Sequence, residues 1–578
     1  MAKWFVTMKK ADFDGIARKY HISPVLARIL RNREVTADED IRKFLNGTLA
    51  DLYEPEQMKD LVKGCKIALE AIRQGKNVRI IGDYDIDGIC STHILKRAFT
   101  MAGADVDTAI PHRIKDGYGL SDHLIEVAHE EGRELIVTCD NGIAAAEQIA
   151  YANSLGMGVI VTDHHEVPYR ETESGKEELL PPALAVIDPK REGCEYPYKG
   201  ICGAVVAYKF ADVLLKMSEN VAQTERELFL QEELAFAAIA TVGDVMELLD
   251  ENRLIVRYGL REVEQTTNTG LRALIDVCGL VDKKISPYQV GFVLGPCINA
   301  TGRLDTAKRA LELFETTNER EAVLLATELK ELNENRKGIT QEELENAIEM
   351  IERKPLDKVM VVYLPQCHES IAGIIAGRLR ERYLRPAIVL TRGEEGVKGS
   401  GRSIESYSMY DKLHEVEDLF TKYGGHPMAA GLSMADESDV EKLRKRLNEN
   451  ADLTEEDFVE KVHIDVPTPL SYLTLSFVEE LARLEPYGNG NPKPLFAQKG
   501  VCLKNGRVLG KNRNVAKFSC EDGNGRFLDA VYFGEADEML CRVEAHDGNC
   551  SIVYYPDINE YNGKKSVQIV VKYYDFNS

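Results

Sequence analysis

Three aspartates at alternate positions follow a short apolar run near residue 80, and this stretch constrains the fold more than any other. Asn77–Ile81, NVRII, is typical of a buried strand. Asp83, Asp85 and Asp87 come directly after it, and Ile89–Met101 then has apolar residues at helical spacing. In an open α/β sheet, ligands bind where a strand ends and a helix begins. Like charges this close repel one another unless a cation lies between them, so we expect a divalent metal site. The alternative is a helix cap with solvated loop acids.

Strand and helix patterns alternate from residue 77 to residue 244. Further apolar runs recur along this part of the chain: Leu135–Cys139, Gly158–Thr162 and Ala183–Ile187. The alternation predicts a parallel, doubly wound sheet. The stretch 167–182 is rich in Glu, Pro and Lys, and we expect it to be a surface loop.

The whole chain is long enough for several domains. Helical spacing, strand patterns and turn residues predict five segments: a helical lead-in at 1–55, an α/β unit at 56–250, a helical connector at 251–354, a second α/β unit at 355–452 and a small β-barrel at 463–578. Within the connector, Thr306–Lys354 is highly charged and predicts one or two long helices.

Composition limits the partners of the chain. The formal net charge is −23, which argues against broad, non-specific coating of nucleic acid but allows a local basic groove. No apolar run approaches the roughly 18 residues of a membrane helix, so we expect no membrane partner. The start, MAKWFVTMKK, has no apolar signal core, which predicts a cytoplasmic location. Twelve scattered cysteines without a C-x-x-C pair indicate reduced thiols.

Further metal-ligand candidates follow the other predicted strands. Asp140 comes after LIVTC, Asp163, His164 and His165 come after GVIVT, and Asp244 follows a mostly apolar helix. The ends of adjacent parallel strands lie about 5 Å apart, which suits ligands for two metals about 3.5–4 Å apart. Each residue alone is a weak signal, but together they predict a metal centre. Carboxylate and imidazole ligands without sulfur favour Mn²⁺ or Mg²⁺, and the histidine makes Mn²⁺ the preferred ion.

These motifs resemble those of a known family. The four motifs of the DHH phosphoesterase superfamily match Asp83–Gly88, Asp140–Gly142, Asp163–His165 and Gly243-Asp244, and Gly424–Gly431 resembles the GGH signature of the DHH-associated domain. Three further stretches narrow the resemblance to the RecJ type, a 5′→3′ exonuclease specific for single-stranded DNA: His368–Ile374, Gly399–Arg402 and Glu485–Pro492. The resemblance covers nearly the whole chain in the same order.

The resemblance implies an α/β protein with a parallel-sheet DHH domain, a long connecting helix, a smaller α/β DHH-associated domain and a C-terminal OB-fold β-barrel. It also implies a set of metal ligands: Asp83, Asp85, Asp140, His164 and Asp244. Among these, Asp140 would bridge two divalent cations. His165 would act at the scissile phosphate as a catalytic group rather than as a ligand. Asp87 would cap the following helix or support the ligands.

Several residues are candidates for contacts with the nucleic acid. Arg113 follows a predicted strand near the metal edge and is expected to contact a phosphate; the alternative is a surface charge. Ser400 and Arg402 lie in a glycine-flanked run, KGSGR, where the backbone can approach a phosphate and the guanidinium can fork onto it. The resemblance assigns both to the 5′-terminal phosphate. It places three consecutive residues beside the nucleotides next to the cut: Gly424, Gly425 and His426.

The stretch Gly295–Leu304 resembles a RecJ segment that lies against the substrate. Cys297 stands where the family usually has Arg, so Arg303 becomes the expected phosphate contact there, together with Asn299. The alternative for Asn299 and Arg303 is a structural role that fixes the connector.

The predicted barrel has basic and aromatic residues close together. Between 497 and 520 there are six basic residues and no acid: Lys499, Lys504, Arg507, Lys511, Arg513 and Lys517. Four aromatic residues lie near them in the sequence: Phe496, Phe518, Tyr532 and Phe533. A basic groove with stacking rings suits a single strand, although at least half of these rings should belong to the barrel core.

The expected function is therefore single-stranded-DNA-specific 5′→3′ exonuclease activity in DNA repair and recombination, with release of 5′-mononucleotides by two-metal catalysis. Single-stranded DNA is the expected partner, and a helicase or a single-strand-binding protein is a further candidate. One alternative is a DHH phosphodiesterase for short oligoribonucleotides or cyclic dinucleotides, but those enzymes generally lack the terminal barrel. Two others are a catalytically inactive DNA-binding scaffold and an inorganic pyrophosphatase.

Overall fold

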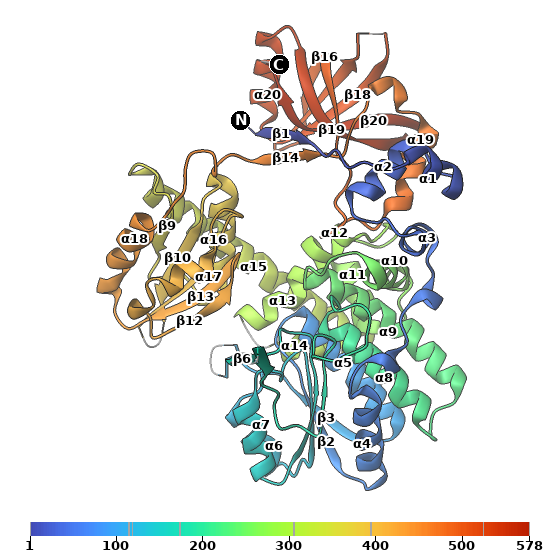
Figure 1. Ribbon diagram of the computed structural model, residues 1–578, viewed down its shortest axis with the longest axis vertical. Helices are drawn as coiled ribbons and strands as arrows, with labels where there is room; N and C mark the ends of the chain where they lie inside the picture. Colours follow the sequence, from blue (N-terminus) through green and yellow to red (C-terminus); the bar gives the residue numbers. More distant parts are fainter. Residues whose placement is uncertain are drawn as a thin grey trace.

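The protein has three lobes arranged around a helical centre (Figure 1). The computed structural model describes residues 2–113, 116–117, 119–172, 175–304, 307–393, 396–523 and 525–576. In the view of Figure 1, a first α/β domain lies at the bottom, a second α/β domain at the left and a β-barrel at the top.

Five parallel strands form the sheet of the first domain, in the order β3-β2-β4-β5-β8. Their bounds are Asn77–Ile81 for β2, Asp105–Ala109 for β3, Leu135–Cys139 for β4, Gly158–Thr162 for β5 and Ala185–Ile187 for β8. Ile81 pairs with Thr138, and Cys139 pairs with Thr162. The strands β2, β4 and β5 therefore end side by side, and the residues that follow them meet at one edge of the sheet.

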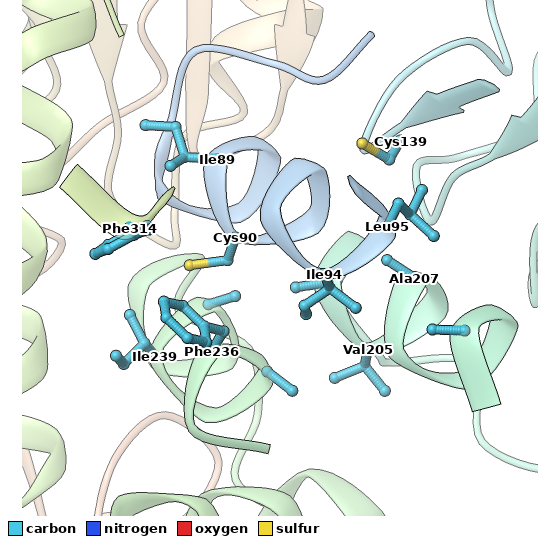
Figure 2. Close-up of a cluster of buried hydrophobic side chains, with 14 of the residues drawn as sticks. Ile89, Cys90, Ile94, Leu95, Cys139, Val205, Ala207, Phe236, Ile239 and Phe314 are labelled. Carbon is cyan, nitrogen blue, oxygen red and sulfur yellow. The ribbon is translucent and has the colours of Figure 1, made fainter. Parts of the chain in front are cut away.

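Helices cover both faces of this sheet, as a doubly wound fold requires. One face carries α4 (Leu61–Arg73), α5 (Ile86–Ala102), α8 (Gly203–Met217) and α9 (Gln223–Gly243), and the other carries α6 (Asp122–Glu130) and α7 (Ala146–Ser154). Figure 2 shows Cys90 of α5 near Phe236 of α9, and Ile94 of α5 near Val205 of α8. Because α5 is buried on nearly all sides, its N-terminus is held firmly at the edge of the sheet.

The connector is helical, as the sequence predicts. It contains α10 (Asp250–Glu264), α11 (Thr269–Val277), α12 (Pro287–Gln289), a π-helical turn (Val290–Leu294), α13 (Gly295–Leu304), α14 (Lys308–Glu315) and α15 (Glu319–Glu352). Most of the stretch Thr306–Lys354, where one or two long helices are expected, is the 34-residue α15, and the short α14 precedes it. Thr306 itself lies outside the described residues. Among the described residues, no helix combines the length and the apolar character needed to cross a bilayer.

The second α/β domain has a mixed sheet in the order β12-β13-β11-β10-β9. The strands are β9 (Met360–Tyr363), β10 (Ala387–Arg392), β11 (Val397–Arg402), β12 (Lys422–His426) and β13 (Ala429–Met434). The helices are α16 (Glu369–Tyr383), α17 (Met409–His414) and α18 (Val440–Glu449). The strand β9 is parallel to β10, and the other pairs are antiparallel. The predicted smaller α/β unit is confirmed.

Five strands of the C-terminal region close into a barrel. They are β16 (Phe496–Leu509), β17 (Val515–Glu521), β18 (Phe527–Phe533), β19 (Asn549–Tyr561) and β20 (Lys564–Asp575), and a short β15 (Val466–Pro467) runs beside β16. Closure follows because β16 pairs with β17 on one side and with β19 on the other. The helix α20 (Ala536–Ala545) follows β18. The predicted small β-barrel is confirmed.

The N-terminal residues belong to the barrel lobe. The expected helices are α1 (Phe13–Tyr20), α2 (Pro24–Asn32) and α3 (Asp38–Asn46). An unpredicted strand β1 (Lys3–Val6) pairs in parallel with β14 (Lys461–Ile464). Buried side chains of α2 and α3, among them Leu26 and Phe44, lie in one apolar cluster with the barrel core. This segment therefore covers the barrel rather than leading into the first domain.

The stretch 167–182 lies at the surface, as expected, but it is not simply a loop. The described part of this stretch contains an antiparallel hairpin of β6 (Tyr169–Thr172) and β7 (Gly175–Glu178). Its side chains are mostly exposed, and an ion pair joins Arg170 to Glu177 across the two strands. Cross-strand pairing of opposite charges allows a polar sequence to form a strand pair without a core.

A buried arginine helps to join the connector to the barrel lobe. Arg253 of α10 is 0% exposed, and its guanidinium stacks on the ring of Phe44 at 3.8 Å. It donates hydrogen bonds to the carbonyl oxygens of Phe44 (3.1 Å), Leu484 (2.8 Å) and Arg483 (2.8 Å). These carbonyls lie at the ends of helical segments on the barrel side. The fork of one side chain therefore satisfies backbone acceptors from two distant parts of the chain.

We expect Arg253→Met to destabilise the protein strongly, because it leaves buried carbonyls without a donor, at about 1–3 kcal/mol for each. Thermal unfolding should show the loss, and the matched control is Arg261→Met, which changes an exposed arginine on the same helix. Equal losses in the two variants would contradict the role of Arg253 as the joint.

Candidate metal centre

The loop after β2 holds the first pair of candidate ligands. Asp83 is fully buried, and its Oδ1 accepts a hydrogen bond from the backbone N–H of Gly119 at 3.4 Å. Asp85 is the N-cap of α5, and its Oδ1 accepts from the N–H groups of Asp87 (3.0 Å) and Gly88 (3.1 Å). A Cβ on Gly88 would lie 2.4–2.6 Å from backbone atoms of Asp83, so a glycine is needed to fold the loop this tightly. The acids predicted at the end of β2 thus lie at the edge of the sheet.

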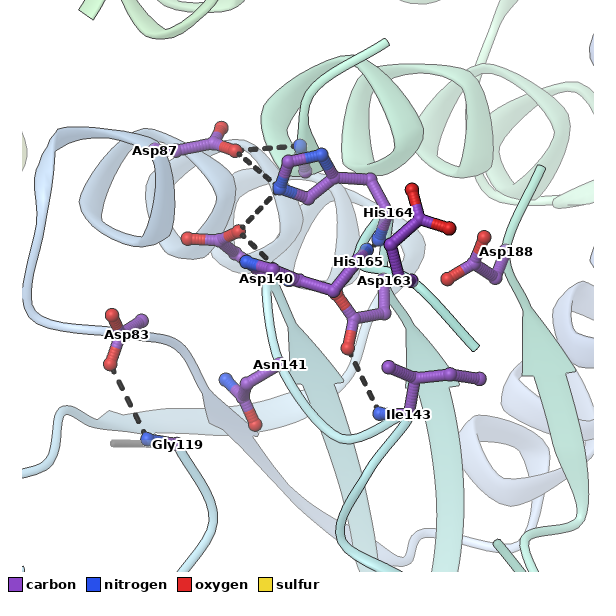
Figure 3. Close-up of polar contacts among 12 residues, drawn as sticks. Asp83, Asp87, Gly119, Asp140, Asn141, Ile143, Asp163, His164, His165 and Asp188 are labelled. Carbon is purple, nitrogen blue, oxygen red and sulfur yellow. Dashed lines mark hydrogen bonds and ion pairs between the residues drawn. The ribbon is translucent and has the colours of Figure 1, made fainter. Parts of the chain in front are cut away.

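The turn after β4 presents Asp140. Its φ is +60°, a left-handed conformation that is uncommon outside glycine, and it is 2% exposed. Asn141 stabilises the turn because its Nδ2 donates to the carbonyl oxygens of Ile81 (3.1 Å) and Cys139 (2.9 Å). The amide therefore ties the ends of β2 and β4 together beside the candidate ligands (Figure 3).

The turn after β5 carries three polar side chains with different roles: Asp163, His164 and His165. Asp163 Oδ2 accepts from Ile143 N at 2.9 Å, and its Oδ1 accepts from the N–H groups of His164 (2.7 Å) and His165 (3.2 Å). The same Oδ1 lies 2.7 Å from Nδ1 of His165. His164 Nε2 lies 3.1 Å from Asp140 Oδ1. Asp163 thus shapes the turn, and His164 faces the other acids (Figure 3).

Asp87 caps a different helix from the one expected. Its two carboxylate oxygens accept from the N–H groups of Gly203 and Ala204, each at 2.7 Å, at the start of α8. The expectation that it caps the following helix α5 is wrong, because Asp85 has that position. Asp87 Oδ2 also lies 3.5 Å from His164 Nε2. Asp87 therefore supports the ligand cluster, which is the second of the two roles expected for it.

The structure brings all of the predicted metal ligands together. Three sets of groups could each hold a metal ion: Asp83, Asp85 and Asp140; Asp140, His164 and His165; Asp87, His164 and Asp244. Asp140 and His164 each belong to two sets, so the sets adjoin. Among the described residues, Asp83 Oδ2 is buried without a hydrogen-bond partner, as a ligand oxygen would be. The carboxylate and imidazole donors fit Mn²⁺ or Mg²⁺.

The electrostatics of the cluster also favour a bound cation. Burial and the charge of Asp85 raise the pKa of Asp83 to about 8. Burial and the charges of Asp87 and Asp85 raise the pKa of Asp244 to about 8. Burial lowers the pKa of His164, which keeps its imidazole neutral and able to bind a metal. A divalent cation would offset the repulsion that these shifts reflect.

His165 differs from its neighbour. Burial alone would lower its pKa, but the hydrogen bond and charge of Asp163 raise the pKa of His165 to about 9. Its side chain is 43% exposed, whereas that of His164 is 7% exposed. A cationic, accessible imidazole suits a group that meets a phosphate.

One acid at this edge was missed in the sequence. Asp188 directly follows β8 and is 0% exposed; its Oδ1 accepts from Lys190 N at 2.7 Å. Burial and the charge of Asp163 raise the pKa of Asp188 to about 8. Its position after the apolar run Ala183–Ile187 is the same signal that pointed to Asp140, and it could have been found in that way.

A cavity of about 600 Å³ adjoins the metal edge and reaches the second α/β domain. Five of the residues predicted to contact nucleic acid line it: Arg113, Arg303, Ser400, Arg402 and Gly424. Lys422 adds positive charge, whereas Lys398 forms an ion pair with Glu369, an acid that lines the same space, at 3.0 Å. Arg402 Nη1 donates to Ser400 Oγ at 3.0 Å, which orients the guanidinium. A cavity of this charge suits a phosphate.

Asn299 does not line this cavity, and Arg303, which does, also has a structural contact. Asn299 Oδ1 accepts from Ile86 N at 2.9 Å, so its observed contact is the structural one of the two alternatives. Arg303 donates to the carbonyl oxygen of Ser370, and burial and the charge of Arg113 lower its pKa to about 10. It therefore has a structural contact as well as a place in the cavity.

Gly425 and His426 are exposed at the end of β12. Lys190 and, to a smaller extent, His426 lower the pKa of Glu166, which follows His165 in the chain. His426 thus lies within electrostatic reach of the metal edge, on the side of the second domain.

The predicted basic surface of the barrel is only partly present. Three of its six cations form ion pairs with acids from other elements: Lys504 with Glu521 (2.5 Å), Arg513 with Asp537 (2.5 Å) and Lys517 with Asp529 (2.7 Å). The rings of Phe496 and Phe518 are buried in the core, whereas Phe533 is 60% exposed. Lys499, Arg507 and Lys511 are exposed and are the part of the surface that could meet a strand.

Comparisons with known proteins match this architecture. Models of the DHH family N-terminal domain, the DHHA1 domain and the RecJ OB domain match residues 77–241, 356–452 and 464–573. The single-stranded-DNA-specific exonuclease RecJ of Bacillus subtilis is 37% identical over 99% of this chain and 70% of its own length. The protein of the same name from Escherichia coli is 32% identical over 95% of each chain. The chain belongs to the RecJ family. A crystal structure of RecJ in complex with Mn²⁺ from Thermus thermophilus has a TM-score of 0.82 at 28% identity and covers 99% of this chain and 79% of that one.

Metal ions are present in solved RecJ structures. The Thermus thermophilus protein was also solved in complex with Mg²⁺, with a TM-score of 0.75, 28% identity and coverage of 99% of this chain and 78% of that one. Membership in the RecJ family and the ligand geometry together identify this chain as a metal-dependent nuclease. The three-domain fold implied by the resemblance is confirmed.

In this RecJ protein, Asp140→Asn should remove most of the stabilisation by Mn²⁺, because Asp140 belongs to two of the ligand sets. For the unchanged protein, Mn²⁺ at 100 times its dissociation constant should add about 2.7 kcal/mol to the free energy of unfolding. Thermal unfolding with and without Mn²⁺ measures both values. Asp122→Asn, which changes an exposed acid of α6, is the matched control. A full Mn²⁺ effect in Asp140→Asn would exclude the bridging position.

Proposed function

We propose that this RecJ-family protein is a single-stranded-DNA-specific exonuclease that removes 5′-mononucleotides in the 5′→3′ direction. Two divalent cations, with Mn²⁺ preferred over Mg²⁺, would be held by five residues: Asp83, Asp85, Asp140, His164 and Asp244. The activity is the one named for the relatives from Bacillus subtilis and Escherichia coli. It would serve DNA repair and recombination.

The observation that carries the proposal is that the cationic cavity adjoins the loop that bears Asp83 and Asp85. Tyr84 lies between Asp83 and Asp85 in the chain, and it lines the cavity. Arg113 stacks its guanidinium over the ring of Tyr84 at 4.8 Å. A phosphate chain that passes Tyr84 would therefore have one phosphate at the metal edge and another among the cations of the second domain.

Bound divalent cations would lower the pKa of the attacking water and stabilise the charge on the phosphoryl oxygens. The protein groups do the positioning. Asp163 fixes the turns after β4 and β5 through backbone N–H groups, and Asp87 fixes the start of α5 to the start of α8, so the ligands need little rearrangement.

His165 would act on the phosphate itself. Asp163 holds the Nδ1 side of its ring and keeps the imidazole protonated near neutral pH. The protonated ring can donate to an oxygen of the scissile phosphate or supply the proton that the departing 3′-oxygen takes up. These are roles in the transition state, so loss of His165 should lower kcat more than it raises KM.

The direction of cleavage would follow from the cavity. Ser400 and Arg402 would bind the phosphate on the 5′ end of the strand, while Arg303 and Arg113 line the path towards the metal edge. Gly424, Gly425 and His426 would contact the nucleotides next to the cut, and Asn299 would contribute by holding the loop at Ile86. With the 5′ end fixed in this way, the next phosphate along is the one exposed to hydrolysis.

The barrel would hold the strand beyond the cut. Its exposed cations Lys499, Arg507 and Lys511 and the exposed ring of Phe533 can contact phosphates and bases without regard to sequence. A path between the two lobes that admits one strand would exclude a duplex. A helicase or a single-strand-binding protein is the candidate partner that would supply such a strand.

Digestion of end-labelled DNA tests the proposal as a whole. With Mn²⁺, a 5′-labelled single strand should release labelled mononucleotide at once, whereas a 3′-labelled strand should shorten progressively. Chelator should abolish both, duplex should resist, and a dinucleotide should be a poor substrate. Preferred cleavage of the dinucleotide would instead favour a DHH phosphodiesterase for short substrates.

Arg402→Ala tests the 5′-phosphate pocket. Loss of a forked contact to a phosphate should lower kcat/KM on 5′-phosphorylated strands by about 10- to 100-fold, equivalent to about 1.5–3 kcal/mol. Strands with a 5′-hydroxyl should be affected much less. The matched control is Arg382→Ala, which changes an exposed arginine of α16 outside the cavity. An equal loss on both kinds of 5′ end would remove Arg402 from the pocket.

A further inference from the structure

Two thiols meet at the junction between the connector helices. Cys278 ends α11 as its C-cap residue, and Cys297 lies in the first turn of α13. Their Sγ atoms are 4.0 Å apart, and both cysteines are free. Figure 1 shows α11, α13 and α15 together at the centre of the molecule, between the three lobes.

The two thiols have different surroundings. Cys297 is 2% exposed; its Sγ donates to the carbonyl oxygen of Val293 at 3.2 Å and accepts from Asn333 Nδ2 at 3.5 Å. Cys278 is partly exposed, beside Lys330 of α15, whose Nζ donates to the carbonyl oxygen of Val277 at 2.7 Å. An accessible sulfur thus lies next to a buried one, which is the arrangement of an attacking thiol and a resolving thiol.

The charges around the pair agree with this assignment. The contact between the two sulfur atoms and the nearby Lys330 and Lys337 lower the pKa of Cys278. The same contact and burial raise the pKa of Cys297. The thiolate, which is the reactive form, is therefore favoured on the exposed partner.

We propose that Cys278 and Cys297 form a site of reversible oxidation that takes hydrogen peroxide and closes to a disulfide. The Cys278 thiolate attacks one oxygen of the peroxide, the O–O bond breaks, and the hydroxide released is protonated to water. This leaves a sulfenic acid on Cys278. The Cys297 sulfur then attacks that sulfur, the S–O bond breaks, and the leaving hydroxide takes up the Cys297 proton as a second water. Two thiols lose two electrons, and one peroxide gains them.

Closing the disulfide is expected to move α13. The two sulfur atoms need to approach from 4.0 Å to a bonded distance of about 2.05 Å, and Cys297 also gives up its thiol hydrogen bond to Val293. The movement is transmitted to the site because Asn299 lies half a turn further along α13 and accepts from Ile86 N. One turn further, Arg303 contacts the carbonyl oxygen of Ser370 in the second α/β domain.

The consequence for activity rests on the proposed nuclease function. A displacement of α13 shifts the N-terminus of α5 relative to the cavity, and misplacement of about 1 Å can cost as much as 100-fold in rate. The oxidised protein should therefore cleave single-stranded DNA at least about tenfold more slowly, and dithiothreitol should restore the rate.

The test exposes the full chain to hydrogen peroxide, blocks the remaining thiols and maps peptides without reduction. The unchanged protein should give a peptide pair linked through Cys278 and Cys297. Cys278→Ser should give no such pair, should keep its activity in reducing buffer and should keep that activity after peroxide. Cys541→Ser, which changes an exposed thiol on α20, is the matched control and should behave like the unchanged protein.

Two outcomes would overturn the proposal. Sulfinic acid on Cys278, or oxidation confined to Cys541, would show that the pair does not close. A linked peptide with unchanged cleavage would show that the bond forms without acting through α13. Peptide mapping does not depend on catalysis, so a failure of the proposed nuclease function, seen as no cleavage by the reduced protein, remains distinguishable from both.

Discussion

Repulsion among carboxylates at one edge of a parallel sheet is the constraint on which the rest of this structure depends. The edge exists because β2, β4 and β5 end in register, and each turn there delivers an acid. The fold partly offsets the repulsion with backbone donors. Asp85 takes N–H groups from the start of α5, Asp87 takes those of α8, and Asp163 takes three from its own surroundings. Asp83 Oδ2 is left without a partner among the described residues, so the balance of charge is completed by a cation.

The helix α13 connects this edge to the second α/β domain. Asn299 fixes the start of α5 and Arg303 reaches Ser370, so one short helix contacts both walls of the cavity. The π-helical turn at Val290–Leu294 leads directly into it, and such turns mark places where a helix is bent to serve a site. The distance between the metal edge and the cations of the cavity is therefore set by the connector rather than by either domain alone.

Much of the site could be predicted because its signals are local. A buried strand followed by an acid is visible in five or six residues, and that pattern located Asp83, Asp140 and His164. The helix that Asp87 caps could not be predicted, because the N-terminus of α8 is more than 100 residues away in the chain. The strand β1 was missed for a similar reason, since four residues pair with a strand near residue 461. Asp188 had the local signal and was overlooked.

The charge of the barrel surface could not be predicted from one segment either, because acids from other elements pair with its cations. The run between 497 and 520 is basic in sequence, yet Arg513 and Lys517 are paired with Asp537 and Asp529, which come from later elements. Counting cations along a segment therefore overstates the field that a strand would meet. The net charge of −23, in contrast, overstates the repulsion that a DNA strand would meet. Charges more than about 8–10 Å away are screened at physiological salt. The strand would respond to the cations within contact distance, such as Arg402 and Lys422 in the cavity, so an acidic protein can bind a polyanion at a few well-placed points.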